Sequence, residues 1–380
     1  MNFEISFCRN IIFKKNAINE IGKYVSNFGK KIIFIYSPSA LKEEKKYDTI
    51  INSLSATGII FFEINGISGE PSPEIIDKIV DDFSDREIEA VLAVGGGSVI
   101  DTAKAVAALL TNEKGIENYL EGVGSGKEII NEPLPVIAVP TTAGSGAEAT
   151  KNAVITSYKK KYKKSFRDSR NIPKLILADS ALTHSLSKEQ TAAGGMDALC
   201  QLIESFISIK KNPYCRAFGS YFIPRAYKSL TSLSNNLYDF EARSVMLEAS
   251  IASGISLANS GLGIVHGFAS GLGGMFDIQH GLICAVILPH SIKLNSKKYN
   301  DLYSEISELI FENKNFKSET LAEKLFELNE YYGIPKNFKK YNIDKKLAKE
   351  IVLLSQGSSL KGNPVSFSDE ELVDFIEELL

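Results

Sequence analysis

The stretch AVLAVGGGSVIDTAK, from Ala90 to Lys104, combines a strand, a glycine turn and the start of a helix. Ala90 to Val94 is a continuous apolar run, typical of a strand buried on both faces of a parallel sheet. The turn after it consists of Gly95, Gly96, Gly97 and Ser98. Such glycines let a backbone approach a phosphate closely, and the helix start offers unpaired N–H groups and a partial positive charge. The spacing matches neither GxGxxG nor GxxxxGK[ST], so a purely structural turn stays open at this point.

Short β-branched runs alternate with helix-like segments on both sides of this stretch, up to about residue 180. The expected strands are Lys31 to Tyr36, Gly58 to Ile64, Ala90 to Val94, Pro135 to Val139 and Leu175 to Ala178. Glu74 to Phe83 and Val99 to Leu110 have the apolar spacing of helices. Strands separated by helices predict a parallel sheet covered on both faces, with its ligand site at the carboxyl ends of the strands.

The strand pattern ends near Asp179, and the rest of the chain is predicted to be helical. The expected helices are Leu186 to Ser208, Pro213 to Leu233, Phe240 to Asn259, Gly281 to Leu294, Tyr299 to Phe311 and Glu319 to Tyr331. The prediction is therefore an α/β nucleotide-binding domain with a parallel, Rossmann-like sheet over residues 1–180. An all-helical metal and substrate domain follows over 181–380, and a site between two such domains is the natural expectation.

Composition excludes several classes of protein. The chain has 380 residues, 44% hydrophobic and 23% charged, as in ordinary globular proteins. Its net charge of −3 argues against a nucleic-acid surface. The four cysteines form no CxxC pair and are interpreted as small core residues in a reducing compartment. No signal-peptide pattern and no apolar run long enough to span a bilayer is found, so we expect a cytoplasmic protein that does not bind membranes.

Three later segments join the glycine turn in a fixed order. They are PTTAGSGAE from Pro140, GGMDALCQ from Gly194, and HGFAS from His266 with QHG from Gln279. With these motifs the chain resembles the iron-containing (group III) alcohol dehydrogenase family, which belongs to the dehydroquinate synthase-like superfamily. The resemblance covers nearly the whole chain. It implies an NAD(P)-dependent alcohol dehydrogenase that acts on a small alcohol or aldehyde, binds one divalent metal and forms a homodimer or larger homo-oligomer.

The nucleotide half of the family site has counterparts here. The pyrophosphate is expected on Gly95, Gly96, Gly97 and Ser98, and the resemblance assigns Thr141 and Thr142 to the cofactor. The resemblance also puts Asp101 near the nicotinamide. A surface ion pair between Asp101 and Lys104, three residues apart, is the alternative for that position.

Cofactor choice is set near the end of the second strand, where an acidic residue binds the ribose 2′-hydroxyl and repels a 2′-phosphate. This chain has Ser37 there. Ser37 removes the repulsion, and no nearby arginine demands a phosphate, so both NAD and NADP are permitted.

The family holds its metal, usually Fe²⁺ or Zn²⁺, with one aspartate and three histidines. Asp197, His266 and His280 match three of these ligands, whereas Gln201 stands at the fourth position. Asp197 and Gln201 are four residues apart, on one face of a helix. An amide oxygen is a weaker ligand than imidazole, so we expect Gln201 to be a weak fourth ligand or a hydrogen-bond donor behind the ligands, and the ion to be lost more readily.

The two histidines can meet only if the chain turns back between them. Fourteen residues of unbroken helix would separate His266 from His280 by about 21 Å. The glycines of the run Gly271 to Gly274, together with Asp277, are predicted to supply the break. His184 and His290 lack such a setting and are predicted to be structural.

Two further positions concern catalysis. Ser270 stands where many family members carry a histidine near the substrate, which removes a possible proton relay. Lys163 and Arg167 align with a family stretch between nucleotide and substrate, and Lys163 is predicted to be catalytic, with a solvated basic loop as the alternative.

Three other functions remain open. Gln201 and Ser270 favour a metal-free NAD(P)H-dependent reductase resembling maleylacetate reductase, whereas the retained Asp197, His266 and His280 oppose it. A lyase resembling dehydroquinate synthase fits the surroundings of Asp197 poorly. A catalytically silent nucleotide-binding protein would also combine intact cofactor motifs with an altered metal site.

Overall fold

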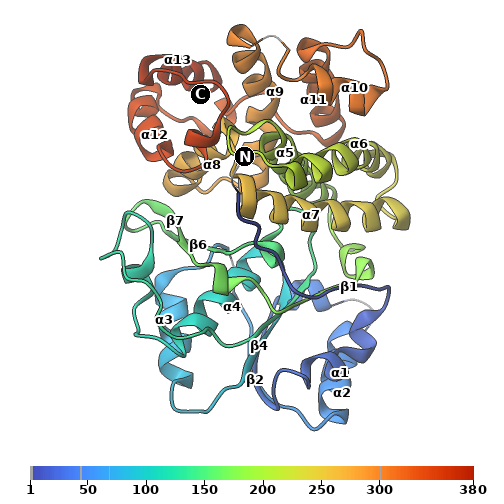
Figure 1. The fold of residues 1–380 in the computed structure, drawn as a ribbon, viewed down its shortest axis with the longest axis vertical. Coiled ribbons are helices and arrows are strands. Elements are labelled where there is room, and N and C mark those ends of the chain that lie inside the picture. The colour runs from blue at the N-terminus through green and yellow to red at the C-terminus, as the bar shows by residue number, and fades with distance from the viewer. Residues whose placement is uncertain (1–2, 43–44, 68, 300) are drawn as a thin grey trace. The chain divides into compact units, whose positions relative to one another are not determined.

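The computed structural model describes residues 3–42, 45–67, 69–299 and 301–380, and these form two compact units. The first, here called the α/β unit, comprises Ser6–Thr142 and Gly146–Ser185. The second, the helical unit, comprises Leu186–Leu380 with Ala143–Ser145 and residues 3–5. In Figure 1 the strands belong to the blue and green part of the chain, and the yellow to red part is helical.

The α/β unit is built on six parallel strands. They are β1 (Ile11–Phe13), β2 (Lys31–Tyr36), β3 (Ile60–Ile64), β4 (Ala90–Gly95), β5 (Val136–Pro140) and β8 (Leu175–Ala178), in the spatial order β1-β8-β5-β4-β2-β3. All five predicted strands are confirmed within two residues at each end. The edge strand β1 was not predicted, because its three residues are too few for a pattern and only Ile12 is partly buried between exposed neighbours.

Helices pack on both faces of this sheet. They are α1 (Ile21–Val25), α2 (Lys46–Ala56), α3 (Pro73–Phe83) and α4 (Gly97–Leu109). Successive strand residues belong to opposite cores: Val91 lies with α3 and α4, whereas Leu92 lies with α1 and α2. Because side chains alternate along a strand, a sheet buried on both faces needs apolar residues at every position. The continuous apolar run of β4 is explained in this way.

A separate two-stranded hairpin carries the basic segment of the α/β unit. Its strands are β6 (Asn152–Ser157) and β7 (Tyr162–Arg167), which pair antiparallel. Tyr162 and Phe166 are the buried residues of β7, whereas the lysines between them are only partly covered. The apolar residues of β7 lie four positions apart with lysines between them, so the alternation typical of a strand is absent from the sequence. The hairpin was therefore not predicted.

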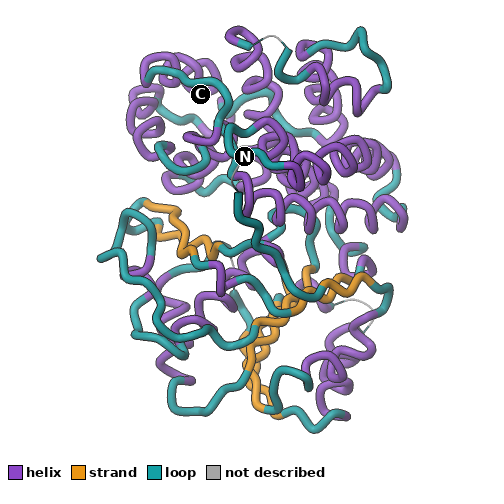
Figure 2. The backbone as a smooth tube through the Cα atoms, in the orientation of Figure 1, coloured by secondary structure: helices purple, strands orange, loops and turns teal. Residues whose placement is uncertain are grey.

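The helical unit contains no strand among its described residues, and the strand-poor prediction for this half is confirmed (Figure 2). Its helices are α5 (Lys188–Ile207), α6 (Pro213–Asn235), α7 (Phe240–Ser260), α8 (Ile264–Met275), α9 (His280–Lys298), α10 (Ser304–Phe311), α11 (Ser318–Tyr332), α12 (Ala348–Ser355) and α13 (Asp369–Leu379). Helix α5 packs against α6, α7 and α9, and almost all of its residues are buried. A capping box of Ser187 and Gln190 fixes where it begins.

The predicted break between the two histidines lies elsewhere. Helix α8 runs through Gly271 and ends at Met275, and the chain turns over residues 276–279, which include Asp277. A Cβ at Gly271 would overlap the Ser355 hydroxyl and lie 2.8 Å from the Ile351 carbonyl oxygen. Gly271 is therefore explained by close packing of α8 on α12, and the assignment of the glycines to the turn was wrong.

No described helix combines the length and apolar character that crossing a bilayer requires.

Candidate metal centre and cofactor turn

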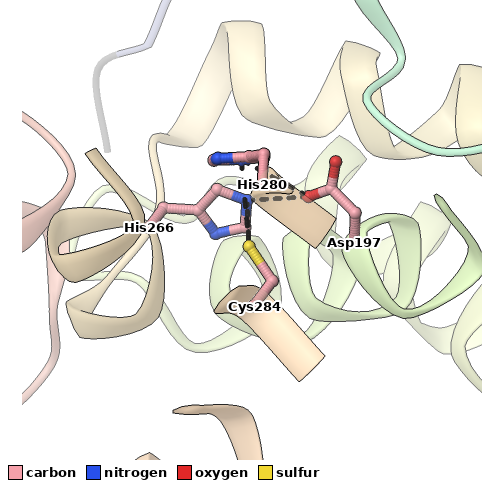
Figure 3. A group of neighbouring side chains, drawn as sticks. All are labelled: Asp197, His266, His280 and Cys284. Carbon is pink, nitrogen blue, oxygen red and sulfur yellow. Dashed lines mark hydrogen bonds and ion pairs between the residues drawn. The ribbon is translucent and has the colours of Figure 1, made fainter. Parts of the chain in front are cut away.

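Three helices of the helical unit bring the predicted metal ligands together. Asp197 comes from α5, His266 from α8 and His280 from the first turn of α9, and Figure 3 shows their side chains converging. Asp197 Oδ1 lies 3.1 Å from His266 Nε2 and 3.8 Å from His280 Nε2. Asp197 and His266 are buried, whereas the His280 side chain is 27% exposed. His280 therefore marks the accessible side of the cluster.

The start of α9 reaches this position because it lies directly against α5. A Cβ at Gly281 would overlap the carbonyl oxygen of Ala193, so only glycine permits the approach. The imidazole rings of His266 and His280 then lie with their centroids 5.5 Å apart. The glycine of the QHG motif thus explains how two helices separated by a short turn present their histidines to one aspartate.

Cys284 is a fourth member of the cluster that the sequence analysis did not single out. Its sulfur lies 3.7 Å from His266 Nε2 and 3.8 Å from His280 Nε2. One ligand atom from each of Asp197, His266, His280 and Cys284 falls within 4.8 Å of the others. Cys284 is four residues after His280, so the helical spacing that was applied to Asp197 and Gln201 would have found it. It was instead interpreted as a small core residue.

Glu204 is a second residue that the sequence analysis missed. Its Oε2 lies 2.7 Å from His266 Nδ1, and its Oε1 accepts the backbone N–H of Val265 at 2.7 Å. Glu204 is buried on α5, seven residues after Asp197 and on the same helix face. A carboxylate on Nδ1 places a proton there and turns Nε2 toward a cation. A buried glutamate at that spacing was the available signal.

Gln201 lies inside the cluster, but its amide oxygen points to another residue. Its Nε2 donates to Asp197 Oδ1 and to the Ser145 carbonyl oxygen, both at 3.2 Å, and its Oε1 accepts from the Ser253 hydroxyl at 2.9 Å. The reverse amide orientation would set oxygen against two acceptors, so the network determines this one. The contacts favour the donor role over the ligand role for Gln201.

The charges of the cluster are mutually supporting. Burial by itself lowers the pKa of His266, but the neighbouring Cys284 sulfur, Asp197 and Glu204 together raise it well above its ordinary value. Burial raises the pKa of Cys200, which stays well above that of a free thiol. The cluster therefore favours a positive charge at the position that faces Asp197. A divalent cation satisfies the same demand, and carboxylate, imidazole and thiol donors suit Fe²⁺ or Zn²⁺ better than Mg²⁺ or Ca²⁺.

The predicted cofactor residues lie next to one another at the carboxyl edge of the sheet. In the sheet, β3 and β4 lie on opposite sides of β2, so the strand order reverses between β2 and β4. In sheets of this kind, ligands bind at the carboxyl ends of the strands where the order reverses. The Ser37 N–H donates to the Val94 carbonyl oxygen at 3.0 Å, and the Thr141 N–H donates to that of Gly95 at 3.0 Å. The residues after three neighbouring strands thus form one continuous edge.

The glycine turn fits a ligand that needs close backbone approach. Gly96, Gly97 and Ser98 are half-buried while the flanking strand and helix are buried, and Gly96 caps α4 without a side-chain hydrogen bond. A Cβ at Gly95 would collide with Val99, and one at Gly96 would lie 3.3 Å from the Thr142 side chain. The first turn of α4 therefore keeps N–H groups available for a phosphate.

Asp101 and Lys104 do form the ion pair considered above, but it is not on the surface. Lys104 Nζ lies 3.2 Å from Asp101 Oδ1 and also donates to Thr150 Oγ1 and the Asn152 carbonyl oxygen. Asp101 Oδ2 accepts the Val154 N–H at 3.0 Å. The surface alternative was wrong. The pair anchors the β6–β7 hairpin to α4.

The two basic residues predicted near the substrate lie on strand β7, and Ser270 lies on helix α8. Lys163 lies on β7 in the α/β unit, with Nζ 2.7 Å from Glu70 Oε1 and a largely covered side chain. Arg167, on the same strand, lies 3.4 Å from Glu121. Ser270 is half-buried on α8, one turn after His266. The solvated-loop alternative for Lys163 does not hold, because the residue is in a strand.

Both halves of the chain match models of one protein family. The family model described as "Iron-containing alcohol dehydrogenase" matches residues 8–180, and "Fe-containing alcohol dehydrogenase family, C-terminal" matches residues 191–380. The NAD-dependent methanol dehydrogenase of Bacillus methanolicus is 27% identical over 97% of both chains. The NADPH-dependent butanol dehydrogenase of Clostridium saccharobutylicum is 28% identical over 97% of this chain and 96% of its own.

A solved structure agrees with the observed fold. The alcohol dehydrogenase from Oenococcus oeni superposes with a TM-score of 0.92 over the full length of both chains, at 26% identity. The predicted combination of a parallel-sheet region and a helical region is confirmed in the same order along the chain.

Proposed function

Because this chain belongs to the iron-containing alcohol dehydrogenase family, we propose that it catalyses reversible hydride transfer between a small alcohol or aldehyde and NAD or NADP. The alcohol loses a hydride to the nicotinamide and a proton to the surroundings, and the reverse reaction reduces an aldehyde. One divalent ion, Fe²⁺ or Zn²⁺, is bound by Asp197, His266 and His280.

The observation that carries the proposal is the meeting of these three side chains. They come from three helices, yet Asp197 Oδ1 lies within 3.8 Å of one nitrogen of each histidine. Two imidazoles and a carboxylate, with Glu204 orienting one ring, are the donor set of a catalytic divalent-metal site. A chain that had lost its metal chemistry would have no physical reason to keep this buried arrangement.

The chain's own residues divide the work between binding and orientation. Gly95, Gly96, Gly97 and Ser98 bind the pyrophosphate through backbone N–H groups, and Thr141 and Thr142 donate to the nucleotide. Asp101, held by Lys104 and by the Val154 N–H, is proposed to lie near the nicotinamide. Lys163, whose Nζ is paired with Glu70 Oε1, is proposed as a cationic donor to the reacting groups. When bound, the ion supplies Lewis-acid stabilisation for the substrate oxygen.

Ser37 is proposed to leave the cofactor choice open. It follows β2 and hydrogen-bonds with Ser39 at 2.9 Å between hydroxyl oxygens. No carboxylate stands at this position to repel a 2′-phosphate. Turnover with NADH and with NADPH should therefore fall within the same order of magnitude.

A panel of small aldehydes assayed with NADH and NADPH, together with elemental analysis of the purified protein, tests the function. We expect turnover by protein that contains one iron or zinc per chain. Activity without stoichiometric metal, and unchanged by added ions, would instead support the metal-free reductase. No turnover of any aldehyde would leave only a nucleotide-binding protein.

The cofactor assignment has its own test. Gly96→Val should weaken NADH binding, because a branched side chain would crowd both Thr142 and the pyrophosphate position. Gly357→Val is the control, since a Cβ at Gly357 meets no atom within 4 Å. Equal affinities in the two variants, measured by NADH fluorescence, would reject the assignment.

We also propose a cytoplasmic protein that assembles as a homodimer or larger homo-oligomer. All four cysteines are buried and unpaired in disulfides, as suits a reducing compartment. Sedimentation at micromolar concentration is expected to give a species larger than the 41.7 kDa chain. A 41.7 kDa species alone would contradict the assembly.

A further inference from the structure

We propose that the thiolate of Cys284 is the fourth metal ligand of this chain, in the role that the sequence analysis gave to Gln201. The inference rests on the proposed metal-dependent function and deepens it. It replaces a weak amide ligand by a strong sulfur ligand, and it assigns the site to a Zn²⁺-type ion.

The distances within the cluster suit a tetrahedral ion. Zinc bond lengths of about 2.0–2.2 Å to nitrogen or oxygen and 2.3 Å to sulfur put tetrahedral ligand atoms about 3.3–3.6 Å apart. Asp197 Oδ1 lies 3.1 and 3.8 Å from the two imidazole nitrogens, and Cys284 Sγ lies 3.7 and 3.8 Å from the same atoms. All four atoms lie within 4.8 Å of one another, and Figure 3 shows the four side chains side by side.

The orientation of His266 decides which of two nearby cysteines is the ligand. Its Nδ1 faces Glu204 Oε2 at 2.7 Å, which leaves Nε2 as the atom for a cation. Cys284 lies on the Nε2 side, whereas Cys200 lies on the Nδ1 side at 3.9 Å. Cys200 is therefore on the wrong side of the ring.

Gln201 is occupied elsewhere. Its amide oxygen, the only atom with which it can ligate, accepts from Ser253, and its N–H groups face Asp197 and Ser145. An N–H group repels a cation. Gln201 instead positions the Asp197 carboxylate through a hydrogen bond. Cys284 supplies the fourth ligand atom.

A thiolate changes which metal the site prefers. Soft sulfur ligands select zinc among the common divalent ions, whereas a site of oxygen and nitrogen ligands discriminates less. With Asp197, His266, His280 and Cys284 as ligands, a bound zinc ion would still supply Lewis-acid stabilisation to a substrate oxygen. The substrate oxygen would enter from the side of the cluster where the His280 side chain is partly exposed.

X-ray absorption spectroscopy of the full-length protein, reconstituted with one equivalent of Zn²⁺, tests the inference. We expect one sulfur scatterer at about 2.3 Å beside nitrogen and oxygen at about 2.0–2.2 Å. Cys284→Ser should lose the sulfur scatterer and bind Zn²⁺ more than about 100-fold more weakly in chelator competition, since even orienting groups contribute 10–100-fold. Gln201→His should not tighten binding.

Cys200→Ser and Cys215→Ser are the matched controls, because both residues are buried cysteines of the same unit. Sulfur retained in both controls supports Cys284 even if Cys284→Ser does not fold. Sulfur lost in Cys200→Ser would overturn the assignment. Zn²⁺ bound with only nitrogen and oxygen neighbours would overturn it while the metal-dependent function stands. Aldehyde turnover by wild-type protein that binds no Zn²⁺ would overturn both.

Discussion

Glu204 determines how His266 is used. A neutral imidazole has one N–H and one lone pair, and the carboxylate on Nδ1 takes the N–H. The lone pair on Nε2 then faces Asp197 and Cys284. Two electron-rich groups facing this nitrogen are stabilised by a proton on Nε2 or by a cation between them. The proposed metal site thus depends on a residue that is not itself among the proposed ligands.

Glu204→Gln is therefore expected to weaken Zn²⁺ binding by about 10–100-fold, because an amide does not fix the Nδ1 proton. The substitution keeps the size of the side chain, so the fold should persist. Chelator competition measures the change, and Glu323→Gln, at an exposed position of α11, is the control. Equal affinity in both variants would show that Glu204 is only a helix-capping group.

Glu148 is the residue whose ionisation should appear in stability. Burial raises its pKa from 4.5 to about 7, an effect that nearby Lys104 only partly offsets, and Oε1 has no hydrogen-bond partner among the described residues. The folded protein then holds a proton that the unfolded chain releases above pH 4.5. Stability should fall as the pH rises from about 4.5 to about 7, by about 3 kcal/mol at most.

Glu148→Gln should remove this fall, so the variant matches wild type near pH 4.5 and is more stable than wild type at pH 8. Urea midpoints at both pH values measure it. Glu74→Gln, at an exposed position of α3, should keep the wild-type pH dependence. A fall of equal size in Glu148→Gln would mean that other groups cause it.

At the scale of elements, the periodic parts of the chain were predictable and the irregular parts were not. β2 and β8 begin and end where the apolar runs do, because each strand is buried along its length. α8 was missed as a helix because its glycines resemble a turn. Its packing on α12 requires one of them, Gly271. A one-dimensional pattern cannot tell a glycine that bends a chain from one that lets two helices touch.

Gly271→Ala tests that distinction. The added Cβ would overlap the Ser355 hydroxyl, so α8 or α12 must move, and we expect a loss of about 1–3 kcal/mol in the free energy of unfolding. A turn glycine without positive φ would tolerate alanine. Gly357→Ala, in open space, is the control for urea denaturation. A Gly271→Ala variant as stable as the control would restore the turn interpretation.

At the scale of the whole molecule, the proposed metal ligands and the predicted cofactor residues belong to different units. Asp197, His266, His280 and Cys284 are in the helical unit, and Gly95–Ser98 are in the α/β unit. Each unit has its own buried core, so each group of residues is held by the packing of its own unit. The two parts should therefore respond independently to perturbation.

Removal of the metal should abolish turnover but leave NADH binding largely intact. Protein dialysed against a strong chelator and checked for metal content is expected to be inactive, to bind NADH within about threefold of the holoprotein, and to recover on addition of Zn²⁺. Loss of NADH affinity in step with metal loss would show that the cofactor residues depend on the ion.

The sequence by itself determined the alternation of strands and helices, the glycine turn and the family, because each is written in local order along the chain. It also singled out Asp197, His266 and His280, whose side chains the structure brings together. Only the tertiary structure revealed Glu204 and Cys284 beside them and showed that the Gln201 amide oxygen faces Ser253. Which atoms meet depends on how α5, α8 and α9 pack against one another. The sequence pattern of one helix shows which face is buried, but not which side chain of another helix lies against it.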